Sequence, residues 1–407
     1  MDFNKLSIKD VDVKDKAVFI RVDYNVPQDD AGVITNTARI DASIPTIQHV
    51  LNSHPKYIVL CSHLGRPKGT GFEQKFSMKP ASEALAKILG KPVTQLEDVV
   101  GPKVEEALKN AKQGEIFMLE NARFYKEETN ENEQDETVKT FRKNLKALAD
   151  IYCDDAFGTA HRPHSSMVGE GFDIRCAGFL LQKEIDYFKI ALAEPKKPYL
   201  AILGGAKISD KTKLIHNLLP KVDKIILCGG MAYAFLKKQG MTIGNSLYDP
   251  KCDADVEIII KKAAELKVEI ILPIDFRCTQ DFKNDAEMKI FTKEQGIPDG
   301  WEGLDAGPKS EEVFKKAVLD SKTIIWNGPA GVFEFANFAK ATFAICDACV
   351  EATTKGAITI IGGGDSATAA KKAKAVDKLS HVSTGGGAAL ELLQGDILPG
   401  VARLSNK

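Results

Sequence analysis

Residues 199–205 read YLAILGG, five apolar positions followed by a glycine pair. A short apolar run bounded by turn residues is typical of a strand buried on both faces of a parallel sheet. Seven other runs have this character, and they lie at 17–22, 57–61, 115–119, 224–228, 268–272, 322–326 and 357–361. Amphipathic stretches of helical length separate them, at 78–90, 101–113, 135–149, 252–266 and 337–354. This alternation predicts an α/β fold in which helices flank parallel sheets.

The chain of 407 residues is longer than one hydrophobic core usually organises, so we expect more than one domain. The segment 180–194 has helical apolar periodicity and separates two groups of predicted strands, and Pro195 and Pro198 follow its periodic part. We therefore expect an N-terminal domain at 1–179, a hinge helix at 180–197 and a C-terminal domain at 198–395.

The composition argues against several classes of protein. Lys and Arg number 55 against 56 Asp and Glu, so no overall field attracts nucleic acid or an anionic membrane. No run approaches the ~18 apolar residues of a membrane span, and residues 1–16 lack the apolar core of a signal peptide. The eight scattered cysteines suit reduced thiols, and we expect the CxxC pair Cys346 and Cys349 to be ordinary helix residues. We expect a cytoplasmic location and no nucleic-acid or membrane partner.

Arginine is concentrated in the first half, where seven of the nine arginines precede residue 176. Four of them fall where loops should gather at the ends of strands: Arg39, Arg66, Arg123 and Arg162. A guanidinium group grips phosphate or carboxylate with a rigid set of donors and keeps its charge. Together with His63, His161, Asp23 and Asn25, these arginines predict a site for a small, multiply charged anion. The alternative is that each arginine forms a salt bridge with a neighbouring acid. Arg21, inside a predicted strand, fits a structural ion pair better, one that supports Asp23.

Glycine replaces arginine at the strand ends of the second half, at 204–205, 229–230, 328–331, 362–364 and 385–387. Glycine lets the backbone approach a ligand, and bare N–H groups at helix N-termini bind phosphate. These loops predict a nucleotide site, whereas the alternative is a set of tight turns without a ligand.

Charged residues beside these glycines suggest phosphoryl chemistry. Lys207 and Lys211 are four residues apart, so they would lean toward one ligand if a helix began near Ser209. Asp365 among phosphate-binding glycines predicts a Mg²⁺ partner, although Asp365 or Ser366 could instead cap a helix. Asp210 would contact the same metal or offset the two lysines.

A dehydrogenase is the rival interpretation. Residues 362–367 (GGGDSA) satisfy the dinucleotide-binding pattern GxGxxA after a predicted strand. That pattern also requires an acidic residue about twenty positions further on, and 380–387 (SHVSTGGG) has none. The chain also lacks the GxxxxGK(S/T) motif, so neither nucleotide signature decides the function.

Eight motifs in order give a more specific indication. They are 21–27 (RVDYNVP), 62–67 (SHLGRP), 119–124 (LENARF), 154–166 (DDAFGTAHRPHSS), 204–207 (GGAK), 326–333 (WNGPAGVF), 362–366 (GGGDS) and 383–392 (STGGGAALEL). In these motifs the sequence resembles the phosphoglycerate kinases, over essentially its whole length. The resemblance implies two Rossmann-like lobes in a monomer that reversibly transfers a phosphoryl group from 1,3-bisphosphoglycerate to ADP, with Mg²⁺. It also implies that the tail 396–407 returns to the first lobe.

The resemblance assigns ligands to both lobes. In the N-terminal domain, 3-phosphoglycerate would be held by Asp23, Tyr24, Asn25, Arg39, His63, Leu64, Gly65, Arg66, Arg123 and Arg162. In the C-terminal domain, the nucleotide would be held by Gly205, Ala206, Lys207, Lys211, Gly229, Gly230, Gly307, Asn327, Gly328, Glu334, Gly363, Gly364, Asp365 and Ser366. Arg39, Lys207 and Lys211 would be catalytic, and Asp365 and Asp210 would serve the metal. Tyr24 and Ser366 stand where phenylalanine and threonine are common in the family.

The reaction implied by the resemblance explains why no base motif is present. The acceptor of the phosphoryl group from ATP is a carboxylate that is already ionised at neutral pH. We therefore expect catalysis by positioning and charge stabilisation, with closure about the hinge that excludes water.

Overall fold

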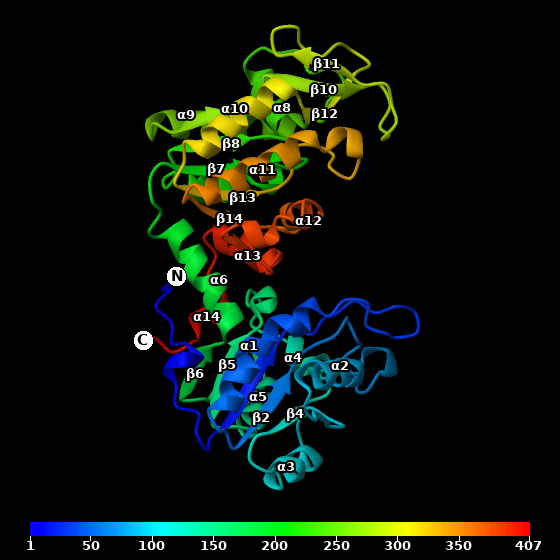
Figure 1. The fold of residues 1–407 in the computed structure, drawn as a ribbon, viewed down its shortest axis with the longest axis vertical. Coiled ribbons are helices and arrows are strands. Elements are labelled where there is room, and N and C mark those ends of the chain that lie inside the picture. The colour runs from blue at the N-terminus through cyan, green and yellow to red at the C-terminus, as the bar shows by residue number, and fades with distance from the viewer. The chain divides into compact units, whose positions relative to one another are not determined.

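A computed structural model describes all 407 residues, which divide into two units. Unit 1 comprises Met1–Asp186 together with Ile397–Lys407, and unit 2 comprises Tyr187–Asp396. The helix expected at 180–194 is α6 (Phe179–Leu192), and the division falls within it (Figure 1). No helix is both long enough and apolar enough to span a bilayer.

Unit 1 is built on a six-stranded sheet with the order β3-β4-β2-β1-β5-β6, in which every pair of neighbours is parallel. The strands are β1 (Ala17–Val22), β2 (Tyr57–Cys61), β3 (Thr94–Gln95), β4 (Glu115–Met118), β5 (Ile151–Asp155) and β6 (Ile174–Ala177). The α-helices are α1 (Ala38–Asn52), α2 (Lys79–Leu89), α3 (Pro102–Lys109), α4 (Lys126–Thr129), α5 (Glu136–Lys146) and α14 (Pro399–Ala402). All residues of the central strands β1, β2 and β5 are buried, so helices and loops cover both faces of the sheet (Figure 1).

The tail Ile397–Lys407 is tied to the start of the chain within unit 1. The Lys5 ammonium is buried and donates hydrogen bonds to Ala402 O (3.1 Å), Leu404 O (3.2 Å) and Asn406 Oδ1 (2.8 Å). The Leu6 N–H donates to Ser405 O (2.8 Å), and the Gly400 N–H donates to Ala160 O (2.9 Å). The tail therefore completes unit 1 and also contacts the loop that follows β5.

Unit 2 contains a second six-stranded parallel sheet, with the order β15-β14-β13-β7-β8-β9. Its strands are β7 (Tyr199–Leu203), β8 (Lys224–Leu227), β9 (Glu269–Ile271), β13 (Thr323–Asn327), β14 (Ile358–Ile361) and β15 (His381–Val382). The helices are α7 (Thr212–Leu218), α8 (Ala232–Lys238), α9 (Asp253–Glu265), α10 (Pro308–Leu319), α11 (Lys340–Thr354), α12 (Gly364–Lys372) and α13 (Gly387–Leu393). A separate antiparallel sheet has the order β11-β10-β12, with β10 (Asp275–Thr279), β11 (Lys289–Thr292) and β12 (Glu302–Ala306).

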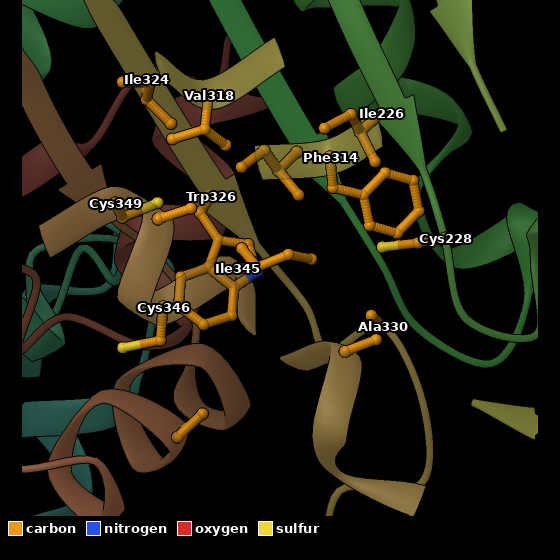
Figure 2. Close-up of a cluster of buried hydrophobic side chains, with 14 of the residues drawn as sticks. Ile226, Cys228, Phe314, Val318, Ile324, Trp326, Ala330, Ile345, Cys346 and Cys349 are labelled. Atoms are coloured by element: carbon orange, nitrogen blue, oxygen red, sulfur yellow. The ribbon is translucent and has the colours of Figure 1, made fainter. Parts of the chain in front are cut away.

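One face of the second parallel sheet packs against α10 and α11 (Figure 2). Trp326 of β13 is fully buried among Phe314 of α10 and Ile345 of α11. Cys346 and Cys349 of α11 belong to the same apolar cluster, so the CxxC spacing is that of two core residues in a helix. The predicted α/β class with two parallel sheets flanked by helices is therefore confirmed, and the antiparallel sheet is an addition that the apolar runs do not predict.

Candidate active site

The predicted anion-binding residues of unit 1 follow neighbouring parallel strands. Strands β4, β2, β1 and β5 are adjacent in the sheet, so their carboxyl ends share one edge. Residues 23–25 follow β1, residues 62–66 follow β2, and Arg123 lies in the short 3-10 helix η3 (Ala122–Phe124) after β4. Arg39 lies in the first turn of α1, and Arg162 follows β5. This is the edge at which ligands bind in open α/β sheets.

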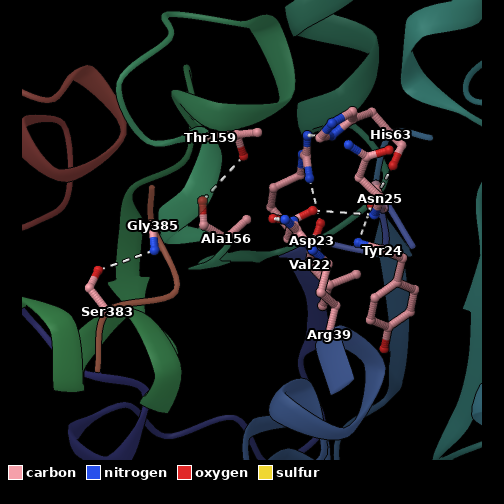
Figure 3. A network of polar contacts seen from close by, with 12 residues as sticks. Val22, Asp23, Tyr24, Asn25, Arg39, His63, Ala156, Thr159, Ser383 and Gly385 are labelled. Carbon is pink, nitrogen blue, oxygen red and sulfur yellow. Dashed lines mark hydrogen bonds and ion pairs between the residues drawn. The ribbon is translucent and has the colours of Figure 1, made fainter. Parts of the chain in front are cut away.

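Three of these loops are joined by polar contacts, and Figure 3 shows the part of this network around Asp23, Asn25 and Arg39. The Arg39 guanidinium pairs with the Asp23 carboxylate. The Gly65 N–H donates to Asn25 Oδ1 (2.9 Å), and Arg123 Nη1 donates to Gly65 O (2.9 Å). Asp23 and Asn25 lie in the loop after β1, and Gly65 lies in the loop after β2. The contacts therefore hold these two loops and Arg123 close together.

The arginines retain donors that no protein atom satisfies. Arg66 and Arg162 are exposed and their guanidinium groups form no hydrogen bond or ion pair, while Arg123 Nε is buried without a partner. The salt-bridge alternative therefore holds for Arg39 only. Unsatisfied guanidinium donors around one loop cluster fit a bound phosphate or carboxylate, which would supply the missing acceptors.

The histidines of this cluster lie in a positive environment. Burial lowers the pKa of His63 well below its ordinary value, and the charges of Arg21 and Arg123 lower it further. Burial, followed by the charges of Arg123 and Arg21, lowers the pKa of His164 to about 3. Both rings are therefore neutral at physiological pH and can donate or accept hydrogen bonds without changing charge.

Two predicted substrate residues turn their side chains away from this edge. Tyr24 is fully buried and its hydroxyl contacts Ser43 Oγ (2.7 Å), while Leu64 is buried in the same core cluster. The reason is that both side chains fill the core beneath the loops. Only their backbone groups could contact a ligand, and the Leu64 carbonyl already accepts from Asn121 Nδ2 (2.7 Å).

Unit 2 has a cleft at the corresponding edge of its own parallel sheet. The cleft has a volume of about 360 Å³ and lies along the loops after β7, β8 and β13. Six predicted nucleotide residues line it: Gly205, Ala206, Gly229, Gly230, Glu334 and Asp365. Lys207 lines a smaller neighbouring cleft of about 240 Å³, which Ala206 and Gly230 share. The glycine loops therefore assemble into a common concave site.

Close contact between loops explains part of the glycine pattern. A Cβ atom at Gly204 would lie 2.0 Å from Pro329 O, and one at Gly328 would lie 2.1 Å from Gly204 O. Gly328 also has φ +101°, a conformation that other residues rarely adopt. These two glycines allow the loops after β7 and β13 to touch, so packing explains why glycine stands there and no ligand is needed. Gly205 and Gly230, in contrast, line the cleft.

Lys207 and Lys211 do not lie on one helix as expected. A 3-10 turn, η6 (Ile208–Asp210), intervenes, α7 begins only at Thr212, and Lys207 has extended backbone. Lys211 is partly buried and its ammonium contacts Asn327 Oδ1 at the end of β13. Burial lowers the pKa of Lys211, while the charges of Asp365 and Asp210 raise it. The exposed Lys207 points to a different wall of the site and has no protein partner.

The residues after β14 divide into exposed and internal groups. Asp365 is exposed in the first turn of α12, beside Gly364, which faces open space, and its carboxylate has no hydrogen-bond partner. Ser366 is fully buried, and its Oγ accepts from the Gly328 N–H (2.6 Å). Gly363 packs against the Asn327 amide, which donates a hydrogen bond to Gly362 O. Ser366, Gly363 and Asn327 therefore hold the loops after β13 and β14 together.

Gly307 does not line the cleft. It is buried at the N-terminus of α10, where a Cβ atom would lie 2.3 Å from Asp275 Cγ and where its N–H donates to Asp275 O (2.8 Å). The glycine at this position therefore allows the start of α10 to pack closely against β10.

Sequence reasoning missed the apolar wall of the cleft. Tyr233 of α8, Leu247, Leu304 of β12 and the 61% exposed Phe282 line it, and the Phe282 ring lies 5.2 Å from the Phe335 ring. Apolar walls of this kind suit a nucleotide base. The motifs consist of charged residues and glycines, so they do not point to this wall. The one signal in the sequence is Phe282, an aromatic residue within the polar stretch 279–285.

The sequence profile of the phosphoglycerate kinases matches residues 8–396. The chain belongs to the phosphoglycerate kinase family. A phosphoglycerate kinase of Yarrowia lipolytica is 54% identical, and one of Candida albicans is 55% identical, each over 99% of both chains. A phosphoglycerate kinase of Schizosaccharomyces pombe is 54% identical, also over 99% of both chains.

Solved phosphoglycerate kinases share the fold. The structure from Coxiella burnetii superposes with a TM-score of 0.89 at 37% identity, and that from Pyrococcus horikoshii superposes with a TM-score of 0.78 at 30% identity. Each comparison covers 98% of both chains. The dehydrogenase alternative receives no support from any of these comparisons with phosphoglycerate kinases.

Proposed function

We propose that the protein is a phosphoglycerate kinase that reversibly transfers a phosphoryl group from 1,3-bisphosphoglycerate to ADP, giving 3-phosphoglycerate and ATP in glycolysis and gluconeogenesis. It is a phosphotransferase whose acceptor is a carboxyl group. One observation carries the proposal. A chain of this family has unsatisfied guanidinium donors at the edge of the unit 1 sheet and a glycine-lined cleft at the edge of the unit 2 sheet.

We assign 3-phosphoglycerate to unit 1. Its phosphate and carboxylate would take the free donors of Arg66, Arg123 and Arg162, with Asn25 and the neutral His63 contributing hydrogen bonds. Asp23, which pairs with Arg39 in the structure, would accept a hydrogen bond from the glycerate hydroxyl and release Arg39. This assignment also accounts for the concentration of arginine in the first half of the chain.

We assign ADP and ATP to the cleft of unit 2. Its apolar wall would hold the base, Glu334 the ribose, and the loops with Gly205, Gly229 and Gly230 the phosphates. The chemistry of the donors fits Mg²⁺, because Asp365 and Asp210 are exposed carboxylates whose charges both act on Lys211. Mg²⁺ bound with the nucleotide would neutralise phosphate charge, and these two carboxylates would hold it together with the phosphate oxygens.

The transfer itself needs positioning and positive charge. No residue has to act as a base, because the acceptor carboxylate is ionised at neutral pH. Arg39 from unit 1 and Lys211 and Lys207 from unit 2 would stabilise the oxygens of the transferring phosphoryl group. Direct in-line transfer requires the two ligands to meet, so we propose closure about α6, which would also exclude water. We further propose that the enzyme is a cytoplasmic monomer.

The test is an assay of the reverse reaction. Purified protein is mixed with ATP, Mg²⁺ and 3-phosphoglycerate, and the acyl phosphate is reduced by a coupled dehydrogenase whose NADH consumption is followed. Turnover should require all three components and stop when 3-phosphoglycerate is omitted. Folded protein that binds ATP but gives no turnover with 3-phosphoglycerate would refute the proposal.

A further inference from the structure

A buried chain of hydrogen bonds runs from His63 to a carboxylate in unit 1. Arg21 Nη2 contacts His63 Nδ1 (3.2 Å), and Arg21 Nε donates to Ser166 Oγ (2.7 Å). Ser166 Oγ donates to Glu128 Oε1 (2.6 Å), and the Ser166 N–H donates to Glu128 Oε2 (2.9 Å). His63 is 3% exposed, Ser166 is 1% exposed, and Arg21 and Glu128 are not exposed at all. The expected support of Asp23 by Arg21 is not what the structure shows, since Arg21 connects to His63 instead.

The chemistry of the guanidinium group sets the proton position on the imidazole. An arginine side chain has only donors and does not lose its proton in a protein. His63 Nδ1 must therefore be the acceptor of the contact with Arg21 Nη2, and the proton of the neutral ring must be on Nε2. A buried partner that selects one tautomer in this way also fixes the orientation of the ring.

Besides burial, the largest charge effects on His63 all lower its pKa. They come from Arg21 of β1, Arg123 of η3 and Arg39 of α1, and His164 before η5 (Ser165–Met167) would add to them only when protonated. Each of them, together with burial, disfavours the imidazolium. Glu128 is linked to Arg21 through Ser166 and forms no ion pair with His63; burial raises the pKa of Glu128, and the charge of Arg21 lowers it.

We propose that Arg21 and Glu128 are positioning residues that hold His63 as a neutral imidazole protonated on Nε2, so that its single donor is available to the substrate anion. The inference rests on the proposed role of His63 in binding 3-phosphoglycerate. Arg21 itself is fully buried and satisfied by Ser166, His63 and its neighbour Val22 O, so it acts through His63 and not by direct contact. Ser166 is hydrogen-bonded to both side chains and so links Glu128 to Arg21.

The first experiment needs no substrate, and its only variant serves to assign signals. Nitrogen NMR of protein labelled with ¹⁵N-histidine, with the His63 signals assigned by comparison with His63→Gln, reports the protonation of each ring nitrogen. Between pH 5.5 and 8, Nε2 should carry the proton and Nδ1 should not. A ring protonated on Nδ1, or an imidazolium in this pH range, overturns the proposal whatever the enzymatic activity is.

The second experiment links the tautomer to the substrate. Arg21→Met removes the donor to Nδ1 and one positive charge, so we expect KM for 3-phosphoglycerate to rise about tenfold at pH 7.5, the cost of one misplaced hydrogen bond. KM for ATP should stay within about twofold. The pKa of His63 should rise, because one of the positive charges that lower it is lost while burial remains, and the nitrogen signals of His63 report this change. The same substitution removes a charge that lowers the pKa of His164, so the signals of the two rings are followed separately.

A double-mutant cycle separates this role from general destabilisation. If Arg21 acts through His63, Arg21→Met should change KM for 3-phosphoglycerate less than about twofold in the His63→Gln background. An undiminished tenfold effect in that background overturns the proposal. Lys5→Met is the matched control, since it removes another buried cation of unit 1 and should leave the His63 signals unchanged.

The single variant leaves Glu128 without a counter-charge and could fail to fold. The double variant Arg21→Met/Glu128→Gln removes both charges and avoids this cost. We expect it to reproduce the raised KM for 3-phosphoglycerate and the altered nitrogen signals of His63. A folded double variant with the kinetics and His63 spectrum of the unmodified protein contradicts the proposal.

Discussion

At the scale of single residues, Arg39 combines a structural contact with an available charge. Its guanidinium pairs with Asp23, yet its side chain remains 45% exposed at the edge where the anion would bind. An exposed ion pair of this kind contributes little to stability. The side chain can therefore exchange its partner for a substrate oxygen without unfolding its surroundings.

We expect Arg39→Ala to lower kcat by about 10²–10³-fold while ATP affinity and the fold persist, because the lost charge stabilises the transferring phosphoryl group. Steady-state kinetics with varied 3-phosphoglycerate and ATP, together with ATP titration calorimetry, measure both effects. Lys103→Ala, which breaks the exposed pair with Glu97 in the same unit, should leave kcat unchanged. An unchanged kcat in Arg39→Ala would remove it from the catalytic set.

Asp365 is the residue on which the metal assignment depends. For Asp365→Asn we expect the Mg²⁺ concentration at half-maximal rate to rise at least about tenfold at fixed ATP, because a phosphate-bound Mg²⁺ loses a carboxylate ligand. Rates measured across a Mg²⁺ titration test this. Asp377→Asn, an exposed aspartate of the same unit, should have no such effect. If both variants require the same Mg²⁺ concentration as the parent, Asp365 is not a ligand of the metal.

The motifs indicate which types of residue gather at the two sheet edges, but they do not indicate the direction in which each side chain points. Free arginine donors and glycine-lined loops follow from residue chemistry alone. The burial of Tyr24 and Ser366 does not, because a motif records which residues are required and not whether the ligand or the core requires them. For Ser366, the partner is the Gly328 N–H, which lies 38 positions away in the chain and cannot be inferred from local spacing.

At the scale of elements, the N-terminus of α6 rests on a buried carboxyl group. Asp155, at the end of β5, accepts hydrogen bonds from the Leu180 N–H (2.9 Å) and the Leu181 N–H (3.2 Å). Burial nevertheless raises the pKa of Asp155 to about 7 and that of the adjacent Asp154 to about 8. Strand β5 and helix α6 are therefore joined through a carboxyl group whose pKa lies near neutral pH.

The pH dependence of stability follows from these two groups. Between about pH 4 and pH 7 the folded protein binds protons that the unfolded chain has released, so stability falls as the pH rises, by up to about 1.4 kcal/mol per pH unit for each carboxyl. We expect Asp155→Asn to reduce this slope in unit 1 between pH 5 and 7. Amide hydrogen exchange in β1 and β5 measures it.

The control for this experiment lies in unit 2. Burial also raises the pKa of Asp305 to about 7. Asp305→Asn should therefore change the pH dependence of exchange around β12 and leave β1 and β5 as they were. An identical slope in Asp155→Asn and the parent protein would mean that Asp155 stays ionised in the folded state.

Elements differed in how well the sequence predicted them. The apolar runs became β1, β2, β4, β7, β8, β9, β13 and β14, because strands buried on both faces need uninterrupted apolar sequence. Strand β11 is exposed or half-exposed along its length, and β10 contains the buried Arg277, which pairs with Asp305 and Glu311. Charged or exposed strands carry no such signal, so the antiparallel sheet could not be predicted.

At the scale of the whole molecule, unit 1 depends on residues from both ends of the chain. We expect Lys5→Met to lower its stability by about 2 kcal/mol, because the hydrogen bonds of a buried ammonium to the tail are lost while an apolar stem of similar length remains. Hydrogen exchange of residues 400–405 reports the loss. Lys407→Met breaks the exposed pair with Asp10 and should have a much smaller effect. Equal protection of the tail in both variants would refute the role of Lys5.

The return of the tail to unit 1 has a consequence for how the protein is made. A ribosome releases residues 1–186 before the eleven residues that complete their unit have been synthesised, and all of unit 2 emerges in between. Lys5 and Ala160 therefore lack their partners in the tail until translation has passed residue 400. Unit 2, which is continuous in the chain, can complete its contacts first. The nascent N-terminal part must therefore avoid aggregation throughout that interval, and its contacts with the tail form only after residue 400 has been synthesised.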